Sequence, residues 1–378
     1  MEIAETKHYS WKIGSMAKGC RLCVKGLKSV LFVTGLCPKH CFYCPISDKK
    51  RGRDIVYINE MPDAGIKEII KEIKLCGSKG IGITGGDPLA RIERVIKYIK
   101  ALKKRFGKKF HIHLYTPLNL VDGKKLKKLY DAGLDEIRIH PDLNSKKEWE
   151  KIGLALNYKW RVGVEIPAVP GLKRETIEII NYLSGKIDFL NINELEVSDS
   201  NANSLVEKGF MPKNETSYGV KGSEELGLGL LEYIAKNRIK LNAHYCTTTL
   251  KDKIQLAKRI KRRAANIKKD YDILTKDGML KRGAIYLSSF CPGFGYNKKI
   301  EKLGRNEKSM ILKRLNKIKK ELAAKYTIPK KLIEIDKQRL RILTSTKIIK
   351  KIKNKSIKRA VVEEYPTYDS MIVELEFL

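Results

Sequence analysis

The sequence has no run of about 18 consecutive apolar residues, the length that a membrane-spanning helix requires. Its N-terminus lacks the apolar core of a secretory signal. Acidic residues are scarce, with 43 Asp and Glu against 78 Lys and Arg. The first two absences argue against a membrane partner, so we expect a soluble protein in the cytoplasm. The third leaves a formal net charge of +35, which attracts polyanions.

Chain length and cysteine content narrow the class further. At 378 residues the chain can form two or three domains and a core that needs no disulfides. Five of the eight cysteines fall between residues 20 and 44. Because thiols stay reduced in a cytosol, such a cluster indicates a metal site rather than disulfides.

Short apolar runs alternate with helical patterns from residue 29 to 266. This β/α step predicts a parallel sheet and, with about six units, a partial or full β/α barrel of the α/β class. Beyond residue 266 a helix near 298–326 and later strand-like pieces predict a smaller, basic α+β appendage. We expect three parts: an N-terminal segment with C-x2-C (1–28), a barrel (29–266) and a basic C-terminal domain (267–378). The expected barrel strands are residues 29–34, 80–84, 110–116, 136–140, 161–167, 189–193 and 239–246.

Polar side chains recur at every second position in five of these strands. The apolar positions between them suit the face beneath the helices, which puts the polar ones inside the barrel. A packed barrel interior would consist of Val, Ile and Leu, so a polar one predicts a ligand cavity. Any one of these residues alone could be an ordinary hydrogen-bonded core residue. The inward set is His113, Tyr115, Arg138, His140, Gly163, Glu165, Pro167, Asn191, Asn193, Asn242, His244 and Cys246.

Cys37, Cys41 and Cys44 form a C-x3-C-x2-C loop directly after the first expected strand. Three thiolates can hold three irons of a 4Fe–4S cluster and leave the fourth iron open. S-adenosylmethionine can bind that iron, and one electron from a reductant then releases a 5′-deoxyadenosyl radical, which abstracts hydrogen. A zinc site would need a fourth ligand of defined spacing.

The loop, its position and the β/α step resemble the radical SAM superfamily over roughly residues 29–250. The segment Ile83–Pro88, after the second expected strand, is similar to the GGE motif of that superfamily, with Asp87 in place of Glu. The resemblance implies a β/α barrel, a 4Fe–4S cluster, S-adenosylmethionine and a one-electron reductant. It also implies that Gly85, Gly86 and Asp87 meet the methionine part of the cofactor and that Tyr43 lies near its adenine.

Three inward residues, His113, Arg138 and Glu165, occupy positions where such enzymes contact ribose or carboxylate. Within the superfamily the chain looks most similar to archaeal relatives of pyruvate formate-lyase activating enzyme. The segments that carry this likeness are Lys18–Cys23, Phe110–Thr116, Asn193–Glu196 and His244–Cys246.

The remaining cysteines allow an auxiliary metal site. Cys20 and Cys23 form a C-x2-C pair before the barrel, while Cys246 and Cys291 lie far along the chain. Together they can supply four thiolates to a second iron–sulfur cluster or to zinc, with His244 as a substitute ligand. The alternative is a knuckle turn and two plain buried thiols.

Residues 251–378 hold 35 basic and 14 acidic residues. The runs 258–263, 313–320 and 347–359 favour contact with RNA, although no aromatic stacking motif accompanies them. A solvated helix face, or the Lys-rich composition of a heat-loving organism, would give the same pattern.

Three functions remain open from the sequence. The first is a radical SAM enzyme that abstracts hydrogen from a substrate, with RNA as a candidate. The second is an activase or peptide-modifying radical SAM enzyme that acts on a protein. The third is a non-enzymatic, metal-stabilised nucleic-acid-binding protein. The sequence names neither the substrate nor the electron donor.

Overall fold

The computed structural model describes residues 1–293, 295–354 and 356–378. The chain folds as two compact units, Met1–Arg259 and Ile260–Leu378. The sequence placed this boundary at 266/267 and set residues 1–28 apart, whereas the structure includes those residues in the first unit. No helix within the described ranges has the length and apolarity needed to cross a membrane.

The first unit contains an 11-stranded sheet whose seven central strands are parallel and follow chain order. Antiparallel strands flank both ends, β4 and β5 beside β3, and β2 and β1 beside β11. The first and last parallel strands, β3 and β11, therefore pair with these flanking strands and not with each other. The parallel strands thus form a partial barrel that does not close. In sheet order the strands are β1 (Ile3–Glu5), β2 (Ser10–Ile13), β11 (Ala243–Cys246), β10 (Phe189–Glu194), β9 (Arg161–Ala168), β8 (Glu136–His140), β7 (His111–Pro117), β6 (Gly80–Thr84), β3 (Lys28–Phe32), β4 (Tyr57–Ile58) and β5 (Met61–Pro62).

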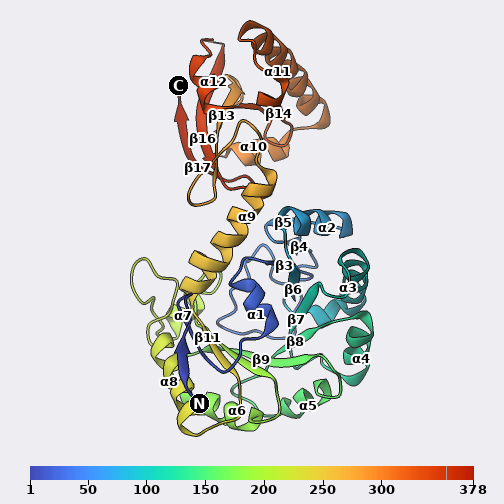
Figure 1. Cartoon of the computed structure of the whole chain (residues 1–378), viewed down its shortest axis with the longest axis vertical. Coiled ribbons are helices and arrows are strands. Elements are labelled where there is room, and N and C mark those ends of the chain that lie inside the picture. Colours follow the sequence, from blue (N-terminus) through green and yellow to red (C-terminus); the bar gives the residue numbers. More distant parts are fainter. Residues whose placement is uncertain (294, 355) are drawn as a thin grey trace. The chain divides into compact units, whose positions relative to one another are not determined.

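Helices cover the outside of the strands, as the β/α step predicted (Figure 1). Local signals set their ends: the Asp122 side chain accepts a hydrogen bond from Lys125 N at 2.7 Å and caps α4, and Gly133 in the left-handed conformation closes it. The helices are α1 (Lys18–Cys23), α2 (Ile66–Leu75), α3 (Ile92–Phe106), α4 (Gly123–Ala132), α5 (Ile152–Ala155), α6 (Lys173–Leu183), α7 (Ala202–Glu207), α8 (Ser223–Lys236) and α9 (Ala257–Ile267), with a π-helix (Leu250–Leu256) before α9.

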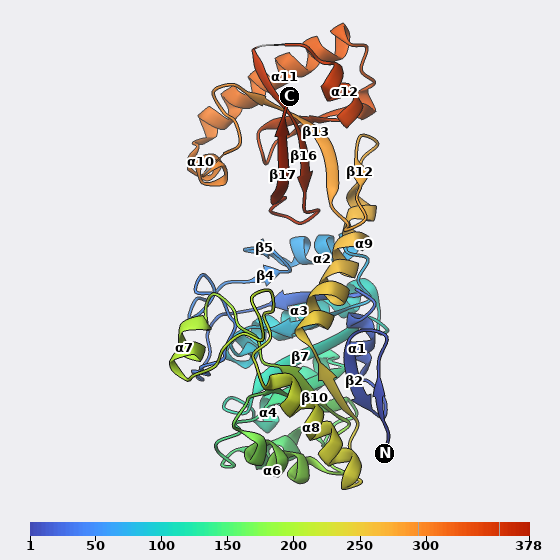
Figure 2. The same ribbon diagram turned by 90° about the vertical axis from the view of Figure 1, so that its left-hand side faces the viewer.

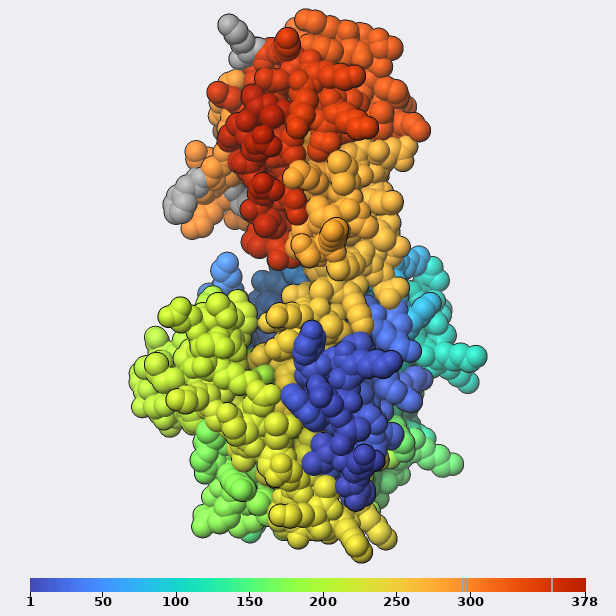
Figure 3. Space-filling view, turned by 60° about the vertical axis from the view of Figure 1, so that its left-hand side comes forward, coloured from blue at the N-terminus to red at the C-terminus, as the bar shows by residue number. Residues whose placement is uncertain are grey.

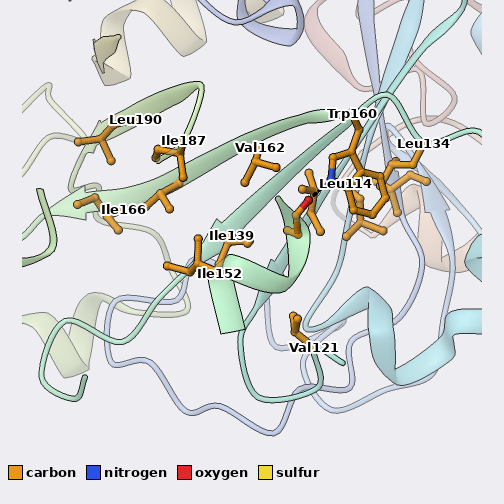
Figure 4. Packing of buried hydrophobic residues seen from close by; sticks show 14 of the residues in the cluster. Leu114, Val121, Leu134, Ile139, Ile152, Trp160, Val162, Ile166, Ile187 and Leu190 are labelled. Carbon is orange, nitrogen blue, oxygen red and sulfur yellow. Dashed lines mark hydrogen bonds between the residues drawn. The ribbon is translucent and has the colours of Figure 1, made fainter. Parts of the chain in front are cut away.

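The apolar positions of the parallel strands pack beneath these helices. Figure 4 shows Ile139 of β8 beside Ile152 of α5, with Val162 and Ile166 of β9 in the same layer. The indole of Trp160 donates a hydrogen bond to Ala155 O at 2.8 Å, so even this buried polar group is satisfied. Burial of one strand face in this way leaves the opposite face to line the barrel interior.

The N-terminal residues complete the first unit from two sides. The hairpin β1–β2 extends the sheet at β11, and Figure 3 shows it in blue against the yellow residues of that region. Helix α1 lies inside the arc of strands (Figure 1). A Cβ on Gly19 would lie 2.4 Å from Arg138 Nη2 and 2.5 Å from His113 Nδ1, so only glycine lets α1 approach these strands so closely.

The second unit is an antiparallel sheet with helices packed on it (Figure 2). The sequence predicted one helix near 298–326, and the structure has two, while the central strand β13 was not predicted. The elements are β12 (Ile273–Leu274), β13 (Leu280–Leu287), α10 (Tyr296–Lys302), α11 (Arg305–Lys325), β14 (Ile333–Asp336), β15 (Arg341–Thr344), α12 (Thr346–Lys351), β16 (Ile357–Glu364) and β17 (Ile372–Phe377).

A buried ion network joins four strands of the second sheet, β13 to β16. Arg341 contacts Glu364 at 2.7 Å and Asp336 at 2.9 Å, and Arg282 contacts Glu364 at 3.0 Å. The Arg341 guanidinium also donates to Tyr286 Oη at 3.3 Å. The charges are therefore paired within the core, as buried charges must be.

Candidate cofactor and substrate site

A cavity of about 760 Å³ opens at the carboxyl ends of the parallel strands, where ligands bind in such sheets. Its wall combines the cysteine loop (residues 35–46), the glycine loop after β6 and the ends of β7 to β10. The predicted site residues in this wall are Cys37, Cys41, Tyr43, Cys44, Gly85, Gly86, Arg138 and Glu165. Asp87 and His113 lie buried behind it.

The three loop thiols border the cavity and are half-buried. Burial raises the pKa of the Cys37 and Cys41 thiols, which favours the protonated form when no metal is bound. Among the described residues, no three His, Cys, Asp or Glu side chains are grouped to hold a single ion. Ligands of one zinc ion would converge, whereas thiolates on three different irons of a cluster lie farther apart. Three thiols of a C-x3-C-x2-C loop on one cavity are the donor set that a 4Fe–4S cluster with one open iron uses.

Two backbone hydrogen bonds fasten the glycine loop to the cysteine loop. Gly86 N donates to Thr34 O at 2.8 Å, and Asp87 N donates to Leu36 O at 2.7 Å. A Cβ on Gly86 would lie 2.4 Å from Leu36 O and 2.8 Å from Cys37 Cβ. Glycine is thus required here because the two loops touch, in addition to any contact with a cofactor.

Asp87 supports this loop from behind the wall. Its Oδ1 accepts hydrogen bonds from Leu89 N and Thr116 Oγ1, both at 2.9 Å. Its Oδ2 has no hydrogen-bond partner in the part of the chain that the structure describes, and burial raises the pKa of this carboxyl. The side chain caps the turn at Pro88 and reaches β7, so it positions the loop.

Arg138 organises the polar wall of the cavity. Its guanidinium contacts Glu136 at 2.6 Å and Glu165 at 2.9 Å, and donates to Tyr115 Oη at 3.2 Å. Glu165 also accepts from the amides of Asn191 and Asn193, each at 2.9 Å. Burial opposes the charge of Glu165, but Arg138 together with the hydrogen bonds from Asn191 and Asn193 outweighs burial and lowers the pKa of this carboxyl. The pair is therefore ionised and held rigidly at the cavity.

His113 lies deeper, beside Glu136 and α1. Burial lowers its pKa well below the usual range, so the imidazole is neutral. Burial likewise lowers the pKa of the nearby Lys28 ammonium to about 7. This ammonium donates to Ile81 O at 2.6 Å and lies 3.1 Å from His111 Nδ1. These groups form the floor beneath the wall, and His113 is not among the residues that line the cavity.

Tyr43 is fixed by a relay that the sequence did not reveal. Its hydroxyl lies 2.9 Å from His140 Nε2, and His140 Nδ1 lies 2.9 Å from Glu165 O. Since a carbonyl only accepts, Nδ1 carries the proton, and Tyr43 donates to Nε2. Burial lowers the pKa of His140, in agreement with this neutral form. Lys39, which pairs with Asp142 at 2.9 Å, holds the same loop from its other side.

A segment between β10 and α8 (residues 195–222) covers the cysteine loop. The rings of Phe42 and Phe210 stack with centroids 6.0 Å apart, and Leu205 and Val220 are buried in the same small cluster. Asn201 donates to Tyr43 O at 3.1 Å. This apolar cover shields the loop from water on one side.

Lys251 and Glu196 form an ion pair of 3.1 Å in the cavity wall. Burial opposes the charge of Lys251, but Glu196 together with Cys246 and Glu165 outweighs burial and raises the pKa of the lysine. Within the described part of the chain, neither side chain has another hydrogen-bond partner, in contrast to Arg138 and Glu165. The pair is thus free to exchange one contact for a ligand. The one feature that points to Lys251 as a functional residue is its place in a π-helix, because π-helices often mark functional sites. The sequence alone does not reveal this π-helix.

The auxiliary cysteines divide between the units. The Cys20 thiol is buried on α1 and accepts from Asn191 Nδ2 at 3.3 Å and Arg138 Nη2 at 3.4 Å. Cys23 and Cys246 are also in the first unit, whereas Cys291 is in the second, where it donates to Leu287 O at 3.3 Å. The auxiliary site stays a prediction.

Comparison with known proteins decides the family. The model described as Radical SAM superfamily matches residues 31–183. A protein of Methanocaldococcus jannaschii named "Putative glycyl-radical enzyme activating enzyme" is 42% identical over 293 residues, which is 75% of this chain and 77% of that protein. The chain belongs to the radical SAM superfamily. It is therefore an enzyme, and the non-enzymatic alternative is set aside.

Other likenesses to this radical SAM enzyme are more partial. A "Probable GTP 3′,8-cyclase" of Methanococcus aeolicus is 29% identical over 170 residues, 44% of this chain and 54% of that protein. A structure of methylornithine synthase has a TM-score of 0.38 at 15% identity, over 54% of this chain and 67% of that one. A structure of an FeFe-hydrogenase maturase scores 0.41 at 12%, over 66% of each. Scores this low do not bear on function. A model described as a domain of unknown function (DUF8061) matches residues 308–376 of the second unit.

Membership of the radical SAM superfamily implies a 4Fe–4S cluster and S-adenosylmethionine. The residues present fit both groups: three thiols border one cavity, the glycine loop touches the cysteine loop, and an ionised polar wall faces them. The sequence identified most of this set from its motifs. It placed His140 on the interior face without a role, and it missed Glu196 and Lys251, whose positions depend on how the strand ends meet.

Proposed function

We propose that Cys37, Cys41 and Cys44 hold a 4Fe–4S cluster and that this enzyme cleaves S-adenosylmethionine reductively. The bound cluster and S-adenosylmethionine supply a 5′-deoxyadenosyl radical that abstracts hydrogen from a substrate in the same cavity. The observation that carries the proposal is the placement of all three thiols on one cavity with the glycine loop and an ionised Arg138–Glu165 wall.

The residues of the chain bind, orient and shield in this scheme. Gly85 and Gly86 expose backbone where the methionine end binds, and the ring of Tyr43 offers a face for the adenine. Arg138 and Glu165 orient polar groups of the cofactor. Phe42, stacked on Phe210, excludes water from the cysteine loop, which protects a radical from side reactions.

Anaerobic reconstitution with iron and sulfide, followed by an assay for 5′-deoxyadenosine, tests this function. The wild type should bind about four irons per chain and form 5′-deoxyadenosine with a strong reductant. Cys37→Ala should bind less iron and form none. Cys76→Ala provides a matched control, because Cys76 is buried in the same unit but absent from the cavity wall. Equal product from wild type and Cys37→Ala would refute the proposal.

Two substrate classes extend this proposal. RNA is the first, on the strength of the basic second unit. A protein substrate is the second, because the relative from M. jannaschii bears the name of a glycyl-radical enzyme activating enzyme. A glycine-centred radical in a partner protein, seen by electron paramagnetic resonance, would support the second class. Consumption of S-adenosylmethionine that depends on added RNA would support the first.

A further inference from the structure

Helix α11 of the second unit exposes a dense set of cations. It carries eight basic and two acidic residues. Leu315 and Leu322 are buried on its inner side. Lys313, Lys317 and Lys320 are exposed on its outer side, three and four residues apart. Since such spacing places side chains on one helix face, their charges adjoin one another.

Acidic residues do not compensate these charges. Glu307 is used at the N-terminus of α11, where it accepts from Gly304 N at 2.7 Å. The ion pairs found in the described part of the second unit involve residues outside α11 and α12, namely Lys269, Lys281, Arg282, Lys331 and Arg341. Like charges at these spacings destabilise a helix. A polyanion would relieve this repulsion.

Helix α12 adds cations beside the C-terminal end of α11. Tyr326, at the end of α11, accepts a hydrogen bond from Lys353 N at 2.9 Å and donates one to Lys353 O at 3.3 Å. This link joins the ends of the two helices, which lie at the same end of the second unit in both views (Figures 1 and 2). The exposed cations of this α11–α12 face are Arg305, Lys313, Arg314, Lys317, Lys320, Lys325, Lys347, Lys350, Lys351 and Lys353.

We propose that the α11–α12 face binds the phosphate backbone of RNA. This inference gives a role to the second unit, which the domain of unknown function matches. It also names the class of partner on which the enzyme acts, and in that respect it rests on the proposed function. An interfacial membrane helix would expose its apolar side, but α11 buries that side in the second core. RNA is favoured over duplex DNA because unpaired bases in RNA loops can leave the stack and reach a cavity.

The composition of the face also predicts how RNA is bound. Lysine and arginine contact phosphates, which position a nucleic acid without reading its sequence. In the part of the chain that the structure describes, the α11–α12 face exposes no aromatic side chain on which a base could stack. Binding should therefore tolerate many sequences and weaken steeply with salt, while selection of the reacting nucleotide would fall to the cavity of the first unit.

A charge-reversal experiment on the full chain tests this surface. The test variant is Lys313→Glu, Lys317→Glu and Lys320→Glu combined. The matched control reverses Lys97, Lys100 and Lys104 of α3, which are exposed at the same spacings in the first unit. Filter binding of total tRNA is measured over a range of salt concentrations. The test variant should lose affinity on the order of 100-fold at about 0.1 M salt, and its salt slope should fall by about 3.

The control and further probes decide the outcome. The α3 variant should change affinity by less than about 3-fold. Equal losses in both variants would show that only net charge matters and would overturn the proposal. Tighter binding to vesicles of phosphatidylserine and phosphatidylcholine than to tRNA would overturn it as well. Thermal melting checks folding, and a variant with glutamine at the three α11 positions replaces the first if it is unfolded.

This test separates the RNA surface from the radical chemistry. Cys37→Ala should keep wild-type tRNA affinity although it forms no 5′-deoxyadenosine. Conversely, the α11 variant should keep cleavage of S-adenosylmethionine in the absence of RNA. Failure of one readout therefore leaves the other intact.

Discussion

Both units bury an arginine between carboxylates, but only one of these arginines borders a cavity. In the first unit Arg138 joins Glu136 and Glu165 at the strand ends. In the second unit Arg341 joins Glu364 and Asp336 inside a closed core. The two networks are chemically alike, so a buried ion network is not by itself evidence of a functional site. The Arg138 network is assigned to a functional site because it borders a cavity that the cysteine loop and the glycine loop also line.

The largest expected effect comes from removing each arginine. Arg138→Met and Arg341→Met should each destabilise the unit that contains it by about 3–5 kcal/mol, because each removes a buried cation that compensates the charge of two carboxylates. Only Arg138→Met should also lower formation of 5′-deoxyadenosine when both variants are assayed at a temperature where they are folded. Urea unfolding and the product assay measure these effects. Loss of cleavage in Arg341→Met would contradict the division of roles.

A second expected effect is a pH dependence confined to the first unit. Burial lowers the pKa of Lys28 to about 7 in the folded chain. A lowered pKa means that stability is present above the unfolded value, near 10.4, and is lost as pH falls through 7. Relative to Lys28→Met, the wild type should therefore gain on the order of 3 kcal/mol between pH 7 and 10. Hydrogen exchange resolved by peptide measures this gain.

The second unit provides the comparison for this pH effect. Its buried cations are arginines, Arg263, Arg282 and Arg341, which do not titrate in this range. A parallel pH-dependent gain in the second unit would show that Lys28 is not its source.

Close-packed glycines give a third, smaller effect. A Cβ on Gly86 would lie 2.4 Å from Leu36 O, and a Cβ on Gly283 would lie 2.7 Å from Ile349 Cβ. Gly86→Ala and Gly283→Ala should each cost about 1–3 kcal/mol through overpacking. Gly86→Ala should also reduce iron binding, since the added methyl group displaces the cysteine loop. Gly283→Ala should spare iron binding, because that glycine contacts α12 in the second unit. Iron bound per folded chain distinguishes the two.

The smallest effect compares two tyrosine hydroxyls. Tyr43→Phe removes the bond to His140, and Tyr326→Phe removes the bonds to Lys353. Each change should reduce the free energy of unfolding by about 1 kcal/mol. Only Tyr43→Phe should alter the paramagnetic resonance spectrum of the reduced cluster, because this residue belongs to the cysteine loop. Identical spectra for wild type and Tyr43→Phe would show that the relay does not orient that loop.

The barrel could be predicted because each strand carries its own period. Alternation within residues 136–140 and 161–167 was enough to place Arg138 and Glu165 on the interior face, and the strands occur at the expected positions. The cysteine and glycine loops follow their strands directly in the chain. Their motifs therefore predicted which residues share the cavity.

The remainder depends on contacts between distant segments. Nothing near Tyr43 in the sequence indicates His140, and Glu196 meets Lys251 only because the residues that follow β10 lie beside the start of the π-helix. Alternation also failed to separate His113, which lies below the cavity, from Arg138, which borders it. Depth along a strand is set by its register with neighbours, which a single strand does not encode.

Helix α1 has a practical consequence for any shortened version of this protein. The superfamily match begins at residue 31, yet Gly19 and Cys20 contact Arg138 from inside the strands. A fragment that begins at residue 31 would lack helix α1. Without α1, water would reach the buried charged groups around Arg138. The excised region would therefore be an incomplete domain rather than a minimal catalyst.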